Sequence, residues 1–202
     1  MRIIAGRFRS RTLNAPAGMG TRPTSDKLRE TLFNVLAPRM EGARFLDLYA
    51  GSGAVGLEAL SRGAAQVTFV ERAPAALSVL RANIEKLGLT EGFRIQAGSV
   101  KGFLHKPGAE QFDLIFLDPP YDADEEYAGT LGLLGGTAGT WLAPDALVIA
   151  EHRSSRGRKE SVQEKYGRLT RTRLKEQGDA ALSFYAEELA QDTGEEDARD
   201  EV

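Results

Sequence analysis

Beyond Gly42, short apolar runs alternate with longer segments in which apolar residues recur every three or four positions. The short runs predict buried strands and the longer segments predict amphipathic helices, because these are the side-chain periods of the two structures. Strands are expected at residues 45–49, 66–71, 93–97, 112–117 and 147–151. Strands that alternate with helices form a parallel sheet with helices on both faces, so we expect a doubly wound α/β fold.

Local signals mark where the expected helices begin and end. Ser25 is a good N-cap, and Asp26 lies in the first turn, where a negative charge is favourable. Pro38 ends this first helix. Further helices are expected from a Gly-rich turn to about residue 61, from Pro74 onward, and over residues 125–134.

The chain ends in a different pattern, with two strand-like runs on either side of a turn. Residues 168–175 and 180–186 flank Gln177-Gly178-Asp179, which predicts an antiparallel hairpin. The expected organisation is a basic β-ribbon and loop at residues 1–24, one α/β domain at 25–186, and an acidic tail at 187–202. The tail lacks apolar periodicity and is expected to be disordered.

The formal net charge of -3 conceals an uneven distribution of charged residues. Residues 187–202 carry eight acids against Arg199 alone, and the rest of the chain has 25 basic and 21 acidic residues. The basic residues are concentrated in residues 1–29 and 153–175. Basic patches on an otherwise acidic chain indicate a polyanionic partner.

The composition excludes several kinds of site. The chain has no cysteine, which excludes disulfides and thiolate metal sites, and only His105 and His152 offer imidazole, so no metal is expected. No apolar run is long enough to cross a bilayer, and the first residues do not resemble a secretory signal. A soluble cytoplasmic protein is therefore expected.

The first expected strand leads into a Gly-rich turn with the spacing of a nucleotide-binding loop. Gly51, Gly53 and Gly56 fit G-x-G-x-x-G, in which glycines let the chain turn sharply and let a ligand approach closely. The next helix begins at this turn, and its free N–H groups favour anionic groups. Glu71 ends the following strand, where an acid can bind ribose hydroxyls. The pattern alone fits an NAD-dependent oxidoreductase, another nucleotide-binding protein, or a structural turn.

Asp47 narrows these alternatives. It lies in the strand that leads into the turn, four residues before Gly51. A dinucleotide site normally has a small or apolar residue there, because pyrophosphate is anionic. A carboxylate suits a cofactor with a cationic amino-acid part, which favours S-adenosylmethionine. Further cofactor contacts are expected from Tyr49, Ser52, Arg72, Ser99 and Val100.

Asp118-Pro119-Pro120-Tyr121 follows the fourth expected strand, at the edge where open α/β sheets bind ligands. An exocyclic amine is a poor nucleophile because its lone pair is delocalised into the ring. The Asp118 carboxylate and a backbone carbonyl near Pro119 can accept both N–H bonds of such an amine, which orients it and localises electron density on nitrogen. Tyr121 can stack on the base. The motif indicates methyl transfer to a planar amine by direct displacement, in which positioning does most of the catalysis.

Taken together, these motifs resemble the RsmD family, the bacterial 16S ribosomal RNA guanine-N2 methyltransferases. The resemblance covers the chain from residue 1 to about residue 186. Its most family-specific segments are M-R-I-I-A-G at residues 1–6, T-R-P-T-S-D at 21–26 and R-E-T-L-F-N at 29–34. The other matching segments are residues 46–58, 60–64 and 112–121.

The resemblance implies a Rossmann-like class I methyltransferase fold, with a seven-stranded, mostly parallel sheet that ends in an antiparallel hairpin. The residues it assigns to the methyl donor are Asp47, Gly51, Gly53 and Glu71. Those it assigns to the target base are Asp118, Pro119 and Tyr121. The expected RNA contacts lie in the basic ribbon and the following loop: Arg7, Arg9, Arg11, Arg22, Pro23 and Thr24.

This chain departs from the family pattern in two places. Relatives often carry an acid that meets the adenine amine after the third strand, where this chain has Gly98-Ser99-Val100, so Ser99 is expected to accept that hydrogen bond. Gln177-Gly178 replaces the more usual Tyr-Gly pair at the last turn. The resemblance also implies a ribosomal RNA partner. Because the chain has only two short basic patches and no accessory domain, we expect a partly assembled small-subunit particle to supply much of the recognition. The protein is expected to be a monomer.

Other functions fit parts of the pattern. The Asp-Pro-Pro-Tyr motif serves any planar amine, so adenine N6 in DNA or RNA and a protein glutamine amide stay open as substrates. The basic ribbon favours RNA over protein. Asp47 and the lack of a catalytic His or Lys constellation oppose an NAD-dependent oxidoreductase. The intact motif at residues 118–121 opposes a non-catalytic RNA-binding module.

Overall fold

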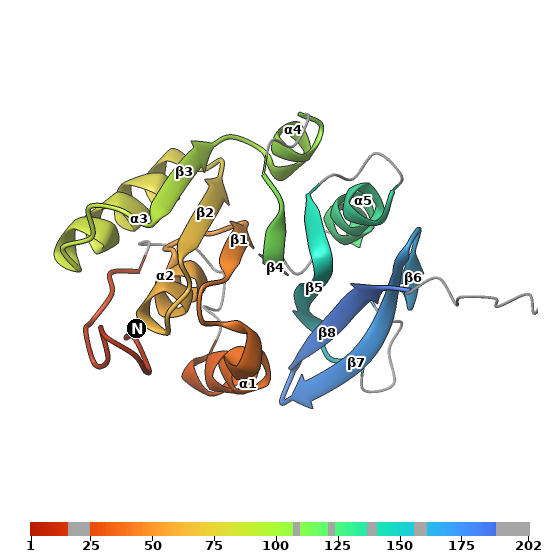
Figure 1. The fold of residues 1–202 in the computed structure, drawn as a ribbon, viewed down its shortest axis with the longest axis horizontal. Coiled ribbons are helices and arrows are strands. Elements are labelled where there is room, and N and C mark those ends of the chain that lie inside the picture. Colours follow the sequence, from red (N-terminus) through yellow and green to blue (C-terminus); the bar gives the residue numbers. More distant parts are fainter. Residues whose placement is uncertain (16–24, 107–109, 121–123, 137–140, 156–160, 189–202) are drawn as a thin grey trace, which may run out of the picture.

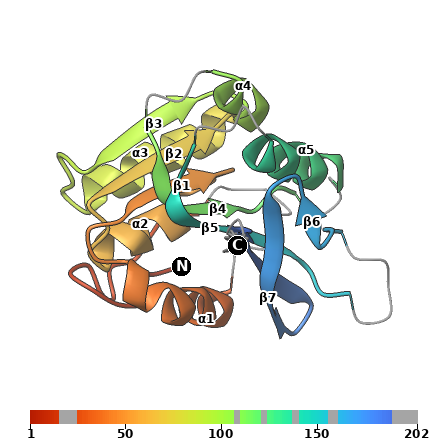
Figure 2. The same ribbon diagram turned by 45° about the vertical axis from the view of Figure 1, so that its right-hand side comes forward.

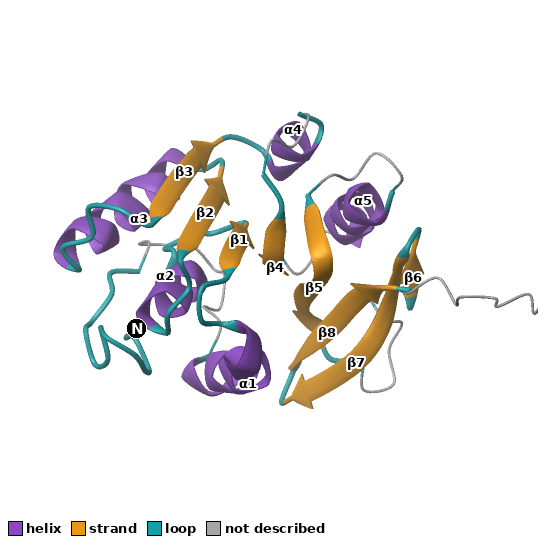
Figure 3. Cartoon of the chain, in the orientation of Figure 1, coloured by secondary structure: helices purple, strands orange, loops and turns teal. Residues whose placement is uncertain are grey.

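A computed structural model describes residues 1–15, 25–106, 110–120, 124–136, 141–155 and 161–188. Its core is one sheet of eight strands in the order β3-β2-β1-β4-β5-β8-β7-β6 (Figures 1 and 3). The strands are β1 (Arg44–Leu48), β2 (Gln66–Glu71), β3 (Phe93–Ala97), β4 (Phe112–Leu117), β5 (Leu142–Arg153), β6 (Lys165–Tyr166), β7 (Leu169–Gln177) and β8 (Ala180–Glu187). The helices are α1 (Asp26–Leu36), η1 (Ala37–Arg39), α2 (Ala54–Ser61), α3 (Pro74–Lys86), α4 (Val100–Leu104) and α5 (Asp124–Gly135).

The sheet confirms the expected α/β class. Strands β1 to β5 pair in parallel, whereas β8 pairs antiparallel with β5 and β7 pairs antiparallel with β8. The expected number of seven strands is one too few, because the two-residue strand β6 adds to the edge formed by β7. A strand of two residues has no periodicity of its own, so only the folded chain reveals it.

Helices cover the two faces of the sheet separately (Figures 1 and 2). On one face, α1, α2 and α3 pack with the N-terminal segment, and Leu32, Phe33 and Leu80 are fully buried there. On the other face, α4 and α5 pack around Tyr127 and Trp141. Among the described residues, no helix is long and apolar enough to cross a membrane.

Local signals account for most element boundaries. The Ser25 hydroxyl accepts a hydrogen bond from the Leu28 N–H at 3.1 Å, which confirms it as the N-cap of α1. Strand β5 begins at Leu142, five residues before the expected strand, and this first part contains Pro144 and Asp145. Asp145 has φ 60°, and the β4–β5 register shifts between Phe112 and Leu114, so an irregular start obscures the strand pattern.

The N-terminal segment is held on α2 by side chains of the helix. The Glu58 carboxylate is fully buried and accepts hydrogen bonds from the N–H groups of Ile4 at 2.7 Å and Ala5 at 3.0 Å. The Ser61 hydroxyl accepts a hydrogen bond from the Phe8 N–H at 3.0 Å. Within the segment, Arg2 and Thr12 form one isolated antiparallel bridge. Residues 16–24 and 189–202, which contain the rest of the expected loop and tail, lie outside the described residues.

Candidate active site at the carboxyl edge of the sheet

Four acidic residues lie at or near the carboxyl ends of β1, β2, β4 and β5. These four strands are neighbours in the middle of the sheet (Figure 1). Asp47 is the fourth residue of β1, and Glu71 ends β2. Leu117 of β4 pairs with Ala150 of β5, so Asp118 and Glu151 follow in register. The carboxylates of Glu151 and Asp47 both act on Asp118, which indicates that the three acids lie close together.

Asp47 is an almost completely buried carboxylate, with 2% of its surface exposed. Its Oδ2 accepts a hydrogen bond from the Gly56 N–H at 2.9 Å, which joins β1 to the first turn of α2. Burial raises the pKa of Asp47 to about 8, and the nearby Glu71 carboxylate adds to this rise, while the Gly56 hydrogen bond opposes it. A buried acid of this kind favours a cationic ligand, because a positive charge would stabilise its ionised form.

The Gly-rich turn has the backbone that its sequence predicts. Gly51 and Gly53 have φ values of 56° and 79°, and Gly53 is the residue from which α2 begins. A Cβ at Gly53 would lie 2.3 Å from the Leu80 Cδ1, so α3 also requires a glycine there. Gly56 lies inside α2, where a Cβ would lie 2.3 Å from the Phe69 ring, so close packing on β2 explains this glycine.

The Glu71 side chain connects the Gly-rich turn to the end of β2 by hydrogen bonds. Its Oε2 accepts a hydrogen bond from the Gly51 N–H at 2.8 Å, and its Oε1 accepts hydrogen bonds from the N–H groups of Arg72 and Ala73 at 2.8 and 2.7 Å. Each carboxylate oxygen has two lone pairs, so Oε2 keeps capacity for a further donor such as a ribose hydroxyl. The side chain of Arg72 is exposed, and its backbone N–H is the part that meets Glu71.

Three other predicted cofactor residues have structural partners of their own. The Tyr49 hydroxyl donates to the Glu126 carboxylate at 2.8 Å and lies 2.7 Å from the Thr130 hydroxyl, so it reaches α5. The Ser99 hydroxyl caps α4 by accepting a hydrogen bond from the Gly102 N–H at 3.1 Å. Val100 is buried beside the same helix start. These contacts alone account for the three residues, and their contact with a cofactor stays a prediction.

The Asp-Pro-Pro segment ends β4 as the sequence predicts. Asp118 is partly exposed at the sheet edge, and Pro119 is buried behind it. Burial raises the pKa of Asp118 well above its usual range, and the negative charges of Glu151 and Asp47 raise it further. Tyr121, which was predicted to stack on the base, lies outside the described residues.

Sequence reasoning missed Glu151, Tyr127 and Asn83. The Tyr127 hydroxyl donates to the Glu151 carbonyl at 2.8 Å and lies 3.4 Å from the Pro119 carbonyl oxygen. The fully buried Asn83 amide donates to the carbonyls of Ser52 at 2.9 Å and Asn14 at 3.1 Å. Glu151 could have been predicted as a site residue, because it is an acid at the end of an apolar run that the pattern assigns to a strand.

The predicted RNA-binding arginines are only partly covered by the structure. Arg7, Arg9 and Arg11 are exposed on the N-terminal segment, and the Arg7 guanidinium lies 4.4 Å from the centre of the Phe8 ring. The remaining three predicted residues, Arg22, Pro23 and Thr24, lie outside the described residues.

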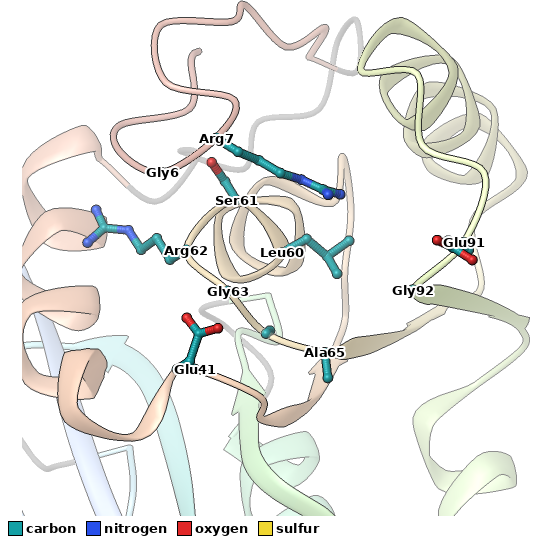
Figure 4. Close-up of a pocket in the computed structure, with 11 residues that line it drawn as sticks. Gly6, Arg7, Glu41, Leu60, Ser61, Arg62, Gly63, Ala65, Glu91 and Gly92 are labelled. Atoms are coloured by element: carbon teal, nitrogen blue, oxygen red, sulfur yellow. The ribbon is translucent and has the colours of Figure 1, made fainter.

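Figure 4 shows a pocket beside Arg7. The pocket lies at the amino ends of the strands, at the opposite edge of the sheet from the acids. Its lining includes Glu41, which lies shortly before β1, residues 62–65, which lead into β2, and Gly92, which directly precedes β3. Its position at the amino ends of these strands separates it from the acids, so it is not the site that their geometry builds.

The acids at the carboxyl edge are not arranged as ligands of a metal. Among the residues that the structure describes, no group of three or more His, Cys, Asp or Glu side chains has metal-binding geometry. The site offers buried carboxylates, a glycine turn at a helix N-terminus, and acceptors at the end of β4. Such a set can hold a nucleoside with a cationic side chain beside a second group that donates hydrogen bonds.

Comparisons with known proteins agree with this description. The family model described as conserved hypothetical protein 95 matches residues 1–186. Ribosomal RNA small subunit methyltransferase D of Escherichia coli K12 is 41% identical over 159 residues, which are 78% of this chain and 77% of that protein. The protein of the same name from Haemophilus influenzae is 40% identical over 75% of this chain and 78% of its own length. The structure of yhhF from Escherichia coli superposes with a TM-score of 0.80 at 36% identity, covering 93% of this chain and 98% of that one.

Proposed function

Because this chain belongs to the RsmD family of methyltransferases, we propose that it methylates the exocyclic N2 amine of a guanine in small-subunit ribosomal RNA. The cofactor is S-adenosylmethionine, which supplies a methyl group bound to a cationic sulfur. The observation that carries the proposal is a pair of acids at the ends of the adjacent strands β1 and β4: Asp47, which is almost completely buried, and Asp118, which is partly exposed. One acid suits the cationic cofactor and the other suits an amine that donates hydrogen bonds.

The residues around the turn fit the cofactor. The Asp47 carboxylate faces a low-dielectric interior, so the cationic amino-acid part of the ligand gains more from it than from an exposed acid. The start of α2, which has no side-chain cap, and the left-handed glycines Gly51 and Gly53 let a ligand approach the backbone. Oε2 of Glu71 retains a lone pair for the ribose. Ser99 and Val100 stand at the end of β3, where the adenine would lie.

The end of β4 fits the target amine. Asp118 and the Pro119 carbonyl are two acceptors on consecutive residues, and together they can accept both N–H bonds of a planar amine. These hydrogen bonds draw electron density onto the nitrogen and hold its lone pair toward the methyl carbon. A new N–C bond then forms as the C–S bond breaks, and the nitrogen loses one proton. Asp118, with its raised pKa, is a suitable acceptor for that proton.

The choice of RNA rests on the basic N-terminal segment. Arg7, Arg9 and Arg11 are exposed on it, where they can neutralise backbone phosphates without reading sequence. We further propose that the protein works as a cytoplasmic monomer and that a partly assembled small-subunit particle supplies much of the recognition. Equal methylation of naked RNA and assembled particles would count against the last point.

The test is methyl transfer from labelled S-adenosylmethionine to small-subunit particles that lack their own methylations. The expected product is N2-methylguanine, and Asp118→Ala should abolish its formation while the variant still binds S-adenosylhomocysteine. Label found as N6-methyladenine would move the target to adenine. Tight cofactor binding with no transfer to RNA would reject the proposal in favour of a DNA or protein amide.

A further inference from the structure

The tyrosine at position 127 stands at the point where the pairing of β4 and β5 stops. Its side chain comes from α5 and is fully buried. The last paired residues are Leu117 and Ala150. Directly beyond them, the Tyr127 hydroxyl donates to the Glu151 carbonyl at 2.8 Å and lies 3.4 Å from the Pro119 carbonyl oxygen. The hydroxyl therefore bridges the two strand ends between which the target amine would be held.

The two prolines explain why a side chain is needed there. Neither Pro119 nor Pro120 has an N–H group, so the backbone of β4 has no donor with which to continue the parallel ladder. Buried carbonyl groups at the end of a ladder nevertheless require partners. The hydroxyl of Tyr127 supplies a donor in place of the missing amides, and it does so from an element outside the sheet.

We propose that Tyr127 is a positioning residue for the reaction, because it fixes the Pro119 carbonyl and, through it, the carboxylate of Asp118. The proposal rests on the function proposed above, in which these two groups accept the N–H bonds of the target amine. A hydroxyl has one proton, which Tyr127 directs at both carbonyl oxygens, with the shorter contact to Glu151 at 2.8 Å and the longer one to Pro119 at 3.4 Å. The longer contact holds the Pro119 carbonyl oxygen in place and uses one of its two lone pairs, so the other stays available to the substrate.

The direct test is Tyr127→Phe, which removes one oxygen atom and keeps the buried ring. Misplacement of a reacting group by about 1 Å can cost on the order of 100-fold in rate. We expect kcat to fall by about 10-fold or more, while the Kd for S-adenosylhomocysteine and the KM for RNA change by less than about 2-fold. Cofactor binding is measured by calorimetry, independently of turnover.

Tyr185→Phe is the matched control. Tyr185 is also fully buried, belongs to the same apolar cluster, and donates its hydroxyl to a backbone carbonyl, that of Gln163, at 2.7 Å. Its hydrogen bond lies away from the ends of β4 and β5. Both variants should lose similar thermal stability, but only Tyr127→Phe should lose kcat. Equal losses of kcat in the two variants would overturn the proposal, as would a kcat for Tyr127→Phe within about 2-fold of the wild-type value.

A second measurement keeps this test separate from that of the proposed function. Hydrogen exchange of the peptides covering residues 110–127 and 147–153 should become faster in Tyr127→Phe and stay unchanged in Tyr185→Phe. The kcat comparison uses whichever amine the wild-type protein methylates, so a wrong base does not affect it. If the wild type transfers no methyl group, the proposed function fails. Unchanged hydrogen exchange in Tyr127→Phe would separately reject the proposal that Tyr127 holds the ends of β4 and β5.

Discussion

Replacing the buried carboxylate of Asp47 with an amide should stabilise the protein while it removes cofactor binding. Asp47→Asn keeps an oxygen that can accept the Gly56 N–H and changes the side-chain volume very little. The wild-type carboxyl has a pKa of about 8 in the folded protein, compared with an ordinary value of 3.8. Between these two values the folded state binds more protons than the unfolded state, so the stability of the wild type falls as the pH rises.

The size of this effect follows from the pKa difference. Each unit of pH between the two pKa values costs about 1.4 kcal/mol of unfolding free energy. At pH 7 the pH lies about 3 units above the ordinary value, so the buried carboxyl costs the wild type about 4 kcal/mol. The asparagine does not titrate, so its advantage over the wild type should grow by about 3 kcal/mol between pH 5 and pH 7.

Urea denaturation of the cofactor-free wild type and variant at pH 5, 6, 7 and 8 measures this difference directly. At pH 7 the variant should also melt higher, by roughly 2–4 °C for each kcal/mol in a chain of this size. Calorimetry should show that the variant no longer binds S-adenosylhomocysteine. Two stability curves that stay parallel from pH 5 to pH 8 would refute the reasoning, because they would mean that Asp47 is ionised in the folded protein.

Three further predictions concern the same edge of the sheet. Cofactor binding should release a proton from Asp47 near neutral pH, so the affinity for the cofactor should rise as the pH approaches about 8. Identical heats of binding in buffers of different ionisation enthalpy would contradict this. Asn83→Ala removes the hydrogen bond to the Ser52 carbonyl and should weaken S-adenosylhomocysteine binding about 10-fold by calorimetry, whereas an unchanged Kd would exclude a role in shaping the turn. Gly53→Ala should lower the unfolding free energy, measured in urea, by about 2 kcal/mol, because the new Cβ would clash with Leu80 and residue 53 has a positive φ. A variant as stable as the wild type would show that α3 moves to make room for the Cβ.

The order of elements could be predicted from the sequence because the central strands are buried on both faces. β2 and β4 are buried along most of their length and begin and end where expected, and the more exposed edge strand β3 also has its expected bounds. The five-residue helix α4 and the two-residue strand β6 were missed, since elements so short show no reliable period and exist through their tertiary neighbours.

The acids of the site were predictable for a topological reason. The carboxyl ends of parallel strands meet at one edge, so Asp47, Glu71 and Asp118 had to lie near one another once their strands were assigned. The contributions of Asn83 and Tyr127 depend on which carbonyls come within reach after folding, and no local pattern encodes that. In the sequence both residues look like ordinary positions on a helix.

The attachment of the N-terminal segment to α2 also bears on how this enzyme can be recombined with its relatives. The buried Glu58 carboxylate accepts hydrogen bonds from the backbone N–H groups of Ile4 and Ala5, and the helix that carries it begins at the Gly-rich turn. In a chimera that exchanges only the first 15 residues, a segment from a relative would have to pack on the α2 helix of this protein, whose side chains bind a different segment. The exchangeable unit therefore extends from the first residue through the end of α2, so an exchange of the N-terminal segment has to bring the Gly-rich turn with it.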